Sequence, residues 1–132
     1  MPRLTTFTWI SIGAVLGANA RYFVNRAAAK WLGAAFPYGT LAVNVLGCLA
    51  IGLVATLAAG RLIGKPEIVR LVVVVGFLGS LTTFSSFSYE THELFRDGAW
   101  VRACANIVLS VLAGLAGVRL GIELTPRLAG LV

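Results

Sequence analysis

The chain has 132 residues, of which 58% are hydrophobic and only 12% charged, about half the charged share of an ordinary soluble domain. This composition argues against a water-soluble fold, and the length leaves room for one domain over residues 1–132. The net charge of +6 is typical of basic loops beside anionic headgroups, and it also suits an entrance that attracts anions. The sequence therefore predicts an all-α integral membrane protein.

Four apolar segments are long enough to cross a bilayer as helices, which takes about 20 residues each. Short connections separate these segments. Glycines recur within them at helical spacing, and such small residues let helix backbones approach closely in a membrane. The predicted spans cover residues 7–24, 40–60, 68–89 and 99–122. The recurring glycines are Gly13, Gly17, Gly76, Gly79, Gly114, Gly117 and Gly121.

The first segment also resembles a secretory signal peptide, because it follows "MPR" and contains "ANA" at residues 18–20. We expect it to stay in the protein, since three further apolar segments follow and its glycines are placed for helix packing. A mature chain that begins after Ala20 would contradict this expectation.

The basic residues give the chain almost no preferred orientation. An even number of spans puts both ends on one side, and the Lys/Arg bias of short loops decides which side that is. Near balance predicts insertion both ways and an antiparallel, dual-topology homodimer, because two-fold dimers are the commonest assembly. A weak bias that the insertion machinery still resolves is the alternative. Six basic residues (Arg3, Arg61, Lys65, Arg70, Arg119 and Arg127) lie on one side, and five (Arg21, Arg26, Lys30, Arg96 and Arg102) lie on the other.

Neutral hydrogen-bonding groups stand inside the spans, whereas all five acidic residues lie in or beside connections and the tail. Carboxylates within a membrane mark proton relays and cation sites, so their absence from mid-span argues against both. Asn44 lies in the second span, and Asn106 and Ser110 share one face of the fourth. Each of these groups alone also suits an interhelical hydrogen bond. Together they favour an anion pathway, because amides and hydroxyls donate without burying a fixed positive charge.

The third segment contains a polar stretch, "GFLGSLTTFSSFSYE", at residues 76–90. Hydroxyls cost free energy in hydrocarbon unless they are bound, so this stretch lies outside the membrane or faces something polar. Two glycines and the Thr82–Thr83 pair predict a break into half-helices, which exposes carbonyls to a cation and a helix N-terminus to an anion. Phe84 and Phe87 share a face. Their ring edges carry partial positive charge and can line an anion path, and two core phenylalanines are the alternative.

Three stretches together resemble the Fluc/CrcB family of fluoride channels: "GAVLGANARY", "GTLAVNVLG" and "GFLGSLTTFSSFSYE". They stand in the family's order and spacing and cover nearly the whole chain. The resemblance implies a passive fluoride-selective channel in the bacterial plasma (inner) membrane, which exports cytoplasmic fluoride and confers fluoride resistance. It implies four transmembrane helices with a broken third helix, assembled as an antiparallel dual-topology homodimer with two pores. Nucleic acid is not an expected partner.

The resemblance also implies roles for single residues of the pore. Phe84 and Phe87 are expected at its aromatic edge, and Asn44 is expected to supply a pore-facing amide. Arg21 is expected at the aqueous vestibule, although an arginine there also suits lipid headgroups. Glu90 is expected near the far end of the broken helix.

A structural sodium ion at the dimer interface is a further implication of the resemblance, with the backbone carbonyls of Gly79 and Thr82 as its ligands. Asn106 stands where the family more often has an aromatic or hydroxyl residue. A polar track on the third and fourth helices is expected to complete the fluoride pore, and its residues are Thr83, Ser86, Asn106 and Ser110.

Two other functions compete with a fluoride channel. A small multidrug-resistance-type cation/proton antiporter has the same size and topology, but its chemistry requires a glutamate embedded in the membrane, and no span has one at its middle. A non-transporting helical assembly would not require a hydroxyl-lined third span. An enzyme is not expected, because the sequence offers no nucleophile–base pair and its single histidine, His92, lies in a connection.

Overall fold

The computed structural model describes residues 3–60 and 64–128, with side chains described as far as Thr125. Within these residues every regular element is a helix, which confirms the predicted all-α class. The elements are α1 (Arg3–Leu32), α2 (Tyr38–Ala59), α3 (Pro66–Val69), the π-helical η1 (Arg70–Leu78), α4 (Gly79–Leu81), α5 (Phe84–Arg96) and α6 (Trp100–Leu128).

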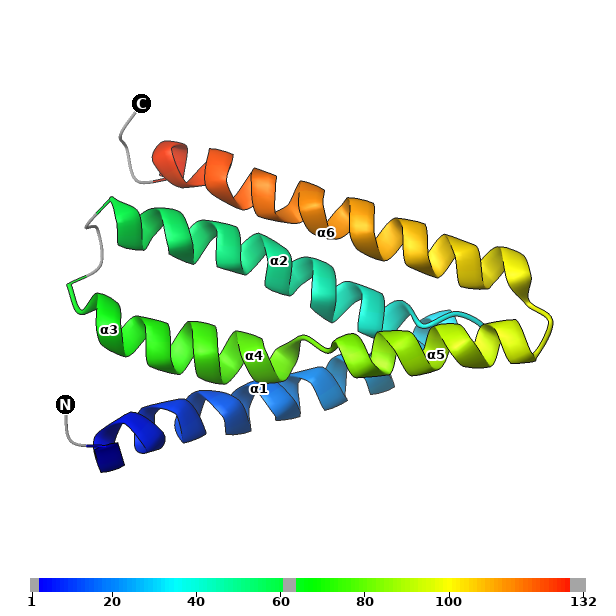
Figure 1. Cartoon of the computed structure of the whole chain (residues 1–132), viewed down its shortest axis with the longest axis horizontal. Coiled ribbons are helices and arrows are strands. Elements are labelled where there is room, and N and C mark those ends of the chain that lie inside the picture. Colours follow the sequence, from blue (N-terminus) through cyan, green and yellow to red (C-terminus); the bar gives the residue numbers. More distant parts are fainter. Residues whose placement is uncertain (1–2, 61–63, 129–132) are drawn as a thin grey trace.

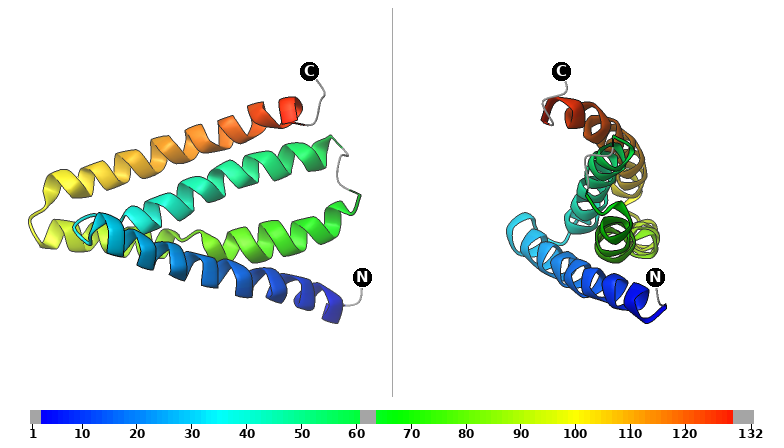
Figure 2. Two further views of the ribbon diagram at one scale, coloured as in Figure 1. Left: turned by 180° about the vertical axis from the view of Figure 1, so that it is seen from behind. Right: turned by 90° about the vertical axis from the view of Figure 1, so that its left-hand side faces the viewer.

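The helices form an elongated bundle in which α2 packs against α6, and α1 packs against η1 (Figure 1). The α1–α2 and α5–α6 connections lie together at one end of the bundle. The start of α1 and the end of α6 lie at the opposite end, as the left-hand view of Figure 2 also shows. This arrangement agrees with the expectation that both ends of the chain share one side.

Three helical segments are long and apolar enough to cross a membrane, and they begin within two residues of the second, third and fourth predicted spans, although the third continues to Arg96. The first predicted span, residues 7–24, lies within the 30-residue α1 but is not one of these three. Asn19 and Arg21 interrupt its apolar run, so the crossing by α1 stays a prediction. The three segments are Tyr38–Ala59, Pro66–Arg96 and Trp100–Thr125.

Glycines in the left-handed backbone region lie in the connections that follow α1 and α5. Gly33 (φ 85°) follows α1, and Gly98 (φ 74°) precedes α6, each where an L side chain is disfavoured. Arg102 in the first turn of α6 donates from Nη1 to the carbonyl oxygen of Ala35, at 2.8 Å. This hydrogen bond ties the start of α6 to the α1–α2 connection.

The third apolar segment is interrupted by two extended residues. Helix α4 ends at Leu81, and α5 begins at Phe84. Between them Thr82 (φ −80°, ψ 154°) and Thr83 (φ −154°, ψ 118°) have the extended backbone of a strand. Figure 1 shows the resulting non-helical link between α4 and α5 in the middle of the bundle.

The predicted glycine contacts bring α1 and η1 together at backbone distance. A Cβ atom built at Gly13 would lie 2.0 Å from the carbonyl oxygen of Val72, and one built at Gly17 would lie 2.2 Å from that of Phe77. The stretch that resembles a signal peptide is therefore an integral part of the packed bundle. Gly79 differs, since the nearest atom to its built Cβ is 3.7 Å away, and close helix packing does not require it.

We expect Gly17→Ala to destabilise the protein by about 1–3 kcal/mol, because the added methyl group would force α1 away from η1. This loss exceeds the gain of about 1 kcal/mol in helix propensity. Thermal unfolding in detergent measures the effect. Gly114→Ala is the matched control, since its Cβ would meet only the Cys48 Sγ atom at 3.4 Å. A Gly17→Ala protein that melts at or above the wild-type temperature would contradict the close packing.

Candidate functional site

A cavity of about 460 Å³ lies where the break between α4 and α5 meets α2 and α6. It contains five of the predicted pore residues and both residues whose carbonyls were predicted to bind sodium. None of the described residues that line it is acidic. Its lining consists of Asn44, Gly47, Cys48, Ile51, Val74, Leu78, Gly79, Thr82, Thr83, Phe84, Phe87, Ser110 and Val111.

Asn44 holds the interrupted backbone through two reciprocal hydrogen bonds. Its Oδ1 atom accepts from the Thr83 N–H at 2.8 Å, and its Nδ2 atom donates to the Thr83 carbonyl oxygen at 3.1 Å. The side chain of α2 thus replaces partners that a continuous helix would provide. An amide NH₂ group has two donors. The second N–H of Asn44 makes no hydrogen bond within the described part of the chain, so it is available to a ligand in the cavity.

Thr83 caps the N-terminus of α5. Its Oγ1 atom accepts from the Ser86 N–H at 3.2 Å and donates to the Ser86 Oγ atom at 3.1 Å, and the Ser85 hydroxyl lies 3.3 Å away. Ser86 does not itself line the cavity, so it supports the predicted polar track from behind Thr83. The positive end of the α5 dipole lies at the cavity and favours negative charge there.

The two predicted phenylalanines stand together on the first turn of α5. The ring centroids of Phe84 and Phe87 are 5.6 Å apart, and their planes are inclined by 42°. Both rings line the cavity, and Phe84 is 79% exposed in the single chain. Phe84 therefore forms the outer edge of the cavity.

Two backbone carbonyls at the break lose the donors that an α-helix would direct at them. The helical donor for Gly79 O is the Thr83 N–H, which donates to Asn44 instead. The helical donor for Thr82 O is the Ser86 N–H, which donates to the Thr83 hydroxyl instead. Carbonyl oxygens of unwound membrane helices coordinate Na⁺ in some transporters, so both groups fit a sodium site chemically.

The predicted α6 residues divide between the cavity and the packed interior. Ser110 lines the cavity, whereas Asn106 is only 1% exposed and does not. Asn106 Nδ2 donates to Thr91 Oγ1 at 2.9 Å, and Ser110 Oγ lies 3.5 Å from Asn106 Oδ1. Sequence reasoning did not single out Thr91, although it follows Phe87 by four residues and therefore lies on the same face of α5.

A second cavity, of about 390 Å³, lies beside the connections and contains Glu90. Thr40 Oγ1 donates to Glu90 Oε1 at 2.8 Å. Glu90 Oε2 and Asn25 Oδ1 are buried without a hydrogen-bond partner among the described residues. Arg21 lies one helical turn before Asn25, lines neither cavity and forms no ion pair with the described residues. Apart from their polarity, nothing in the sequence distinguishes Thr40 or Asn25 as site residues.

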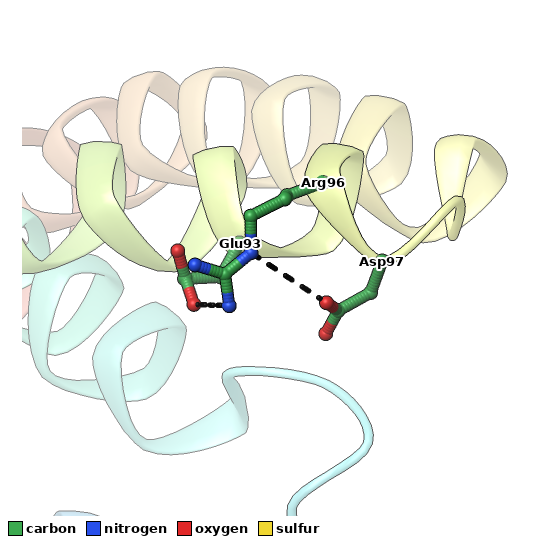
Figure 3. A network of polar contacts seen from close by, with 3 residues as sticks. All are labelled: Glu93, Arg96 and Asp97. Atoms are coloured by element: carbon green, nitrogen blue, oxygen red, sulfur yellow. Dashed lines mark ion pairs between the residues drawn. The ribbon is translucent and has the colours of Figure 1, made fainter.

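The other two carboxylates of the second cavity are paired with Arg96, as Figure 3 shows. Arg96 Nη2 contacts Glu93 Oε2, and its Nε atom lies 3.9 Å from Asp97 Oδ1. Arg96 and Asp97 are exposed and Glu93 is half-buried, so solvent screens these pairs and they stabilise the fold by about 1 kcal/mol at most. Glu90 is therefore the one carboxylate of this cavity that has no ion pair within the described residues.

Comparison with known proteins shows to which family the chain is related. The family described as "CrcB-like protein, Camphor Resistance (CrcB)" matches residues 8–122. The chain belongs to this family. The resemblance drawn from three sequence stretches is thereby confirmed.

Relatives of similar length match over most of the chain, and each is named "Fluoride-specific ion channel FluC". One from Chloroflexus aurantiacus (strain ATCC 29366 / DSM 635 / J-10-fl) is 48% identical over 115 residues, 87% of this chain and 90% of the relative. One from Roseiflexus sp. (strain RS-1) is 49% identical over 112 residues, with coverage of 85% and 90%. One from Geotalea uraniireducens (strain Rf4) is 40% identical over 125 residues, with coverage of 95% and 100%.

These relationships confirm two expectations from the sequence. The relatives are named as ion channels, so the chain is not an enzyme. Their bacterial origin and the three apolar helices identify a multi-pass bacterial membrane protein.

Proposed function

We propose that this chain is a passive, fluoride-selective channel, which exports cytoplasmic fluoride across the bacterial plasma (inner) membrane and confers fluoride resistance. The observation that carries the proposal is the content of the first cavity. It joins a free amide N–H of Asn44, the N-terminus of α5, two phenylalanine rings and the Ser110 hydroxyl, with no carboxylate among its described lining residues. The names of the relatives support the same ion.

The free energy of dehydration explains why these groups suit a small anion. Moving an ion from water into an apolar medium costs tens of kcal/mol if nothing replaces its hydration shell. Several hydrogen-bond donors must therefore take the place of its water. Asn44 and Ser110 offer neutral donors, and the first turn of α5 offers backbone N–H groups. The edges of Phe84 and Phe87 carry partial positive charge and favour an anion over a cation.

A passive pathway is sufficient for export because of the acid–base chemistry of fluoride. Neutral hydrofluoric acid crosses the membrane, ionises in the cytoplasm and is trapped there as the anion. Moving one elementary charge across a membrane potential of 100 mV changes its free energy by about 2.3 kcal/mol. This free energy drives fluoride outward without a coupled ion. Among the described residues that line the first cavity, none is the acidic residue that proton-coupled antiport would require, which disfavours the multidrug-resistance-type antiporter.

The remaining predicted residues take supporting places in this pathway. Thr83 lines it and Ser86 lies behind Thr83, and Asn106 reaches it only through Ser110. Arg21 is assigned to the aqueous vestibule. Glu90 was expected near the far end of the broken helix, but it lies at the middle of α5 and lines the second cavity.

Efflux from liposomes that contain the purified protein tests the function. We expect rapid release of fluoride down its gradient and retention of chloride. Proton-driven exchange of a cationic drug would instead support the antiporter. Release of neither anion, with no exchange, would support a non-transporting helical assembly.

We expect Phe84→Ile and Phe87→Ile each to slow fluoride efflux about tenfold or more, which corresponds to about 1.4 kcal/mol of barrier. Isoleucine keeps an apolar side chain but removes the positive ring edge. Phe23→Ile is the control, because Phe23 is an exposed phenylalanine of α1 that does not line the first cavity. Efflux at wild-type rates in both cavity variants would rule out the ring-edge mechanism.

The variant Asn44→Asp should block fluoride. A fixed negative charge 4 Å from the anion costs about 4 kcal/mol at an effective dielectric constant of 20, which corresponds to about a thousandfold in rate. The same liposome assay measures this loss. Asn19→Asp, on an exposed asparagine of α1, controls for the added charge. Unchanged flux in Asn44→Asp would remove Asn44 from the pathway.

The proposal includes four spans, with α1 as the first, and an antiparallel dual-topology homodimer. The near balance of basic residues supports both orientations. The 79% exposure of Phe84 at the cavity edge supports a second chain there, because it leaves the proposed pore open on one side.

Labelling from one side of a membrane tests the dual topology. We expect Ala34→Cys, in a chain with Cys48→Ser and Cys104→Ser, to react with an impermeant thiol reagent in about half of the molecules. An antiparallel two-fold dimer presents one of its two copies of this residue on each side of the membrane. Reaction of all molecules from one side, or of none, would show a single orientation.

A structural sodium ion at the dimer interface is the last part of the proposal. The carbonyls of Gly79 and Thr82 would hold it, since both have lost their helical donors. A bound sodium ion would supply positive charge to these oxygens. We expect replacement of Na⁺ by N-methylglucamine to lower the thermal unfolding midpoint in detergent, whereas an equal midpoint in both buffers would contradict the site.

A further inference from the structure

Behind the first cavity, four groups form a chain of hydrogen bonds between α6 and α5. Ser110 Oγ donates toward Asn106 Oδ1 at 3.5 Å, and Asn106 Nδ2 donates to Thr91 Oγ1 at 2.9 Å. Thr91 Oγ1 in turn donates to the Phe87 carbonyl oxygen at 2.6 Å. The chain begins at a cavity-lining hydroxyl and ends on the backbone of a cavity-lining phenylalanine.

The two central members are buried and do not line the cavity. Asn106 is 1% exposed and Thr91 is 6% exposed. Thr91 Oγ1 is the only protein acceptor of the Asn106 NH₂ group among the described residues. A buried polar group without a partner costs about 1–3 kcal/mol, so this bond favours one height of α5 against α6.

Helix α5 has a particular need for such a contact. It has 13 residues and follows an extended link, so no continuous helix sets its position from the N-terminal side. Asn44 and Thr83 fix its first residue, and Thr91 and Asn106 fix it two turns later. Phe87 lies between these two points.

We propose that Thr91 and Asn106 form a positioning pair, which sets the orientation of the Phe87 ring toward the anion pathway without contacting the anion. The inference rests on the proposed fluoride channel and deepens it. Asn106 supplies the donor from α6, and Thr91 passes the constraint to the Phe87 backbone. Rotation or sliding of α5 would break the interhelical bond between Asn106 and Thr91, so this bond holds the ring edge in one orientation.

Substitutions at Thr91 separate hydrogen bonding from shape. Thr91→Val keeps the branched side chain but removes the hydroxyl, and we expect fluoride efflux from liposomes to fall about tenfold. Thr91→Ser keeps the hydroxyl, and we expect efflux within about twofold of wild type. Thr125→Val is the matched control, because Thr125 is 2% exposed and its hydroxyl donates only to a carbonyl of its own helix, that of Gly121.

A double variant separates positioning from stability. Replacing both members of a buried pair by apolar groups of similar shape is nearly neutral for stability. We therefore expect Thr91→Val/Asn106→Leu to regain the unfolding temperature lost in Thr91→Val while efflux stays low. Recovery of efflux together with stability would overturn the positioning role, as would wild-type efflux in Thr91→Val. If Thr91→Val does not fold, the double variant gives the same decision.

A spectroscopic readout keeps this test independent of conduction. We expect 4-fluorophenylalanine at position 87 to show a ¹⁹F resonance that shifts in Thr91→Val and returns in Thr91→Ser. Equal resonances in all three proteins would overturn the inference even if the wild type conducts fluoride. A wild type that conducts no fluoride but shows the shift would contradict the proposed function and leave the positioning pair intact.

Discussion

The reciprocal pair of hydrogen bonds between Asn44 and Thr83 is the interaction on which the rest of the site depends. Backbone groups that leave a helix within a membrane must find partners in the protein, because lipid offers none. The amide of Asn44 provides one acceptor and one donor at the spacing of a peptide unit. It therefore replaces the hydrogen-bonding partners that a neighbouring helical turn would supply. An extended link between α4 and α5 requires such a partner, and α2 supplies it. The break in the third segment therefore depends on α2 as well.

One rearrangement at this break produces two opposite electrostatic environments. The Thr83 N–H donates to Asn44, and the Ser86 N–H donates to the Thr83 hydroxyl. These choices leave the Gly79 and Thr82 carbonyls without their helical donors. They also place the capped, positive end of α5 beside the phenylalanine rings. Sites of opposite preference for charge therefore arise a few residues apart from the same local geometry.

Close helix packing keeps this arrangement in place. A Cβ atom at Gly121 would lie 2.3 Å from the Leu49 carbonyl oxygen, so α2 and α6 meet at backbone distance, as α1 and η1 do. Because lipid gives helices no hydrophobic reason to associate, such contacts and a few hydrogen bonds must supply the association. Asn44 and Ser110 consequently face the cavity from two helices that have little freedom to separate.

Local features of the chain were determined by the sequence itself. Its composition predicted a membrane protein, the Thr82–Thr83 pair marked the interruption, and the spacing of Asn106 and Ser110 placed them on one face, where they are hydrogen-bonded. Only the tertiary structure decided which distant groups pair. Thr40 binds Glu90 fifty residues away, and Asn106 turns from the cavity to Thr91. The physical reason is that periodicity encodes the face of each helix, whereas the partner of a polar group depends on which helices pack and at what height.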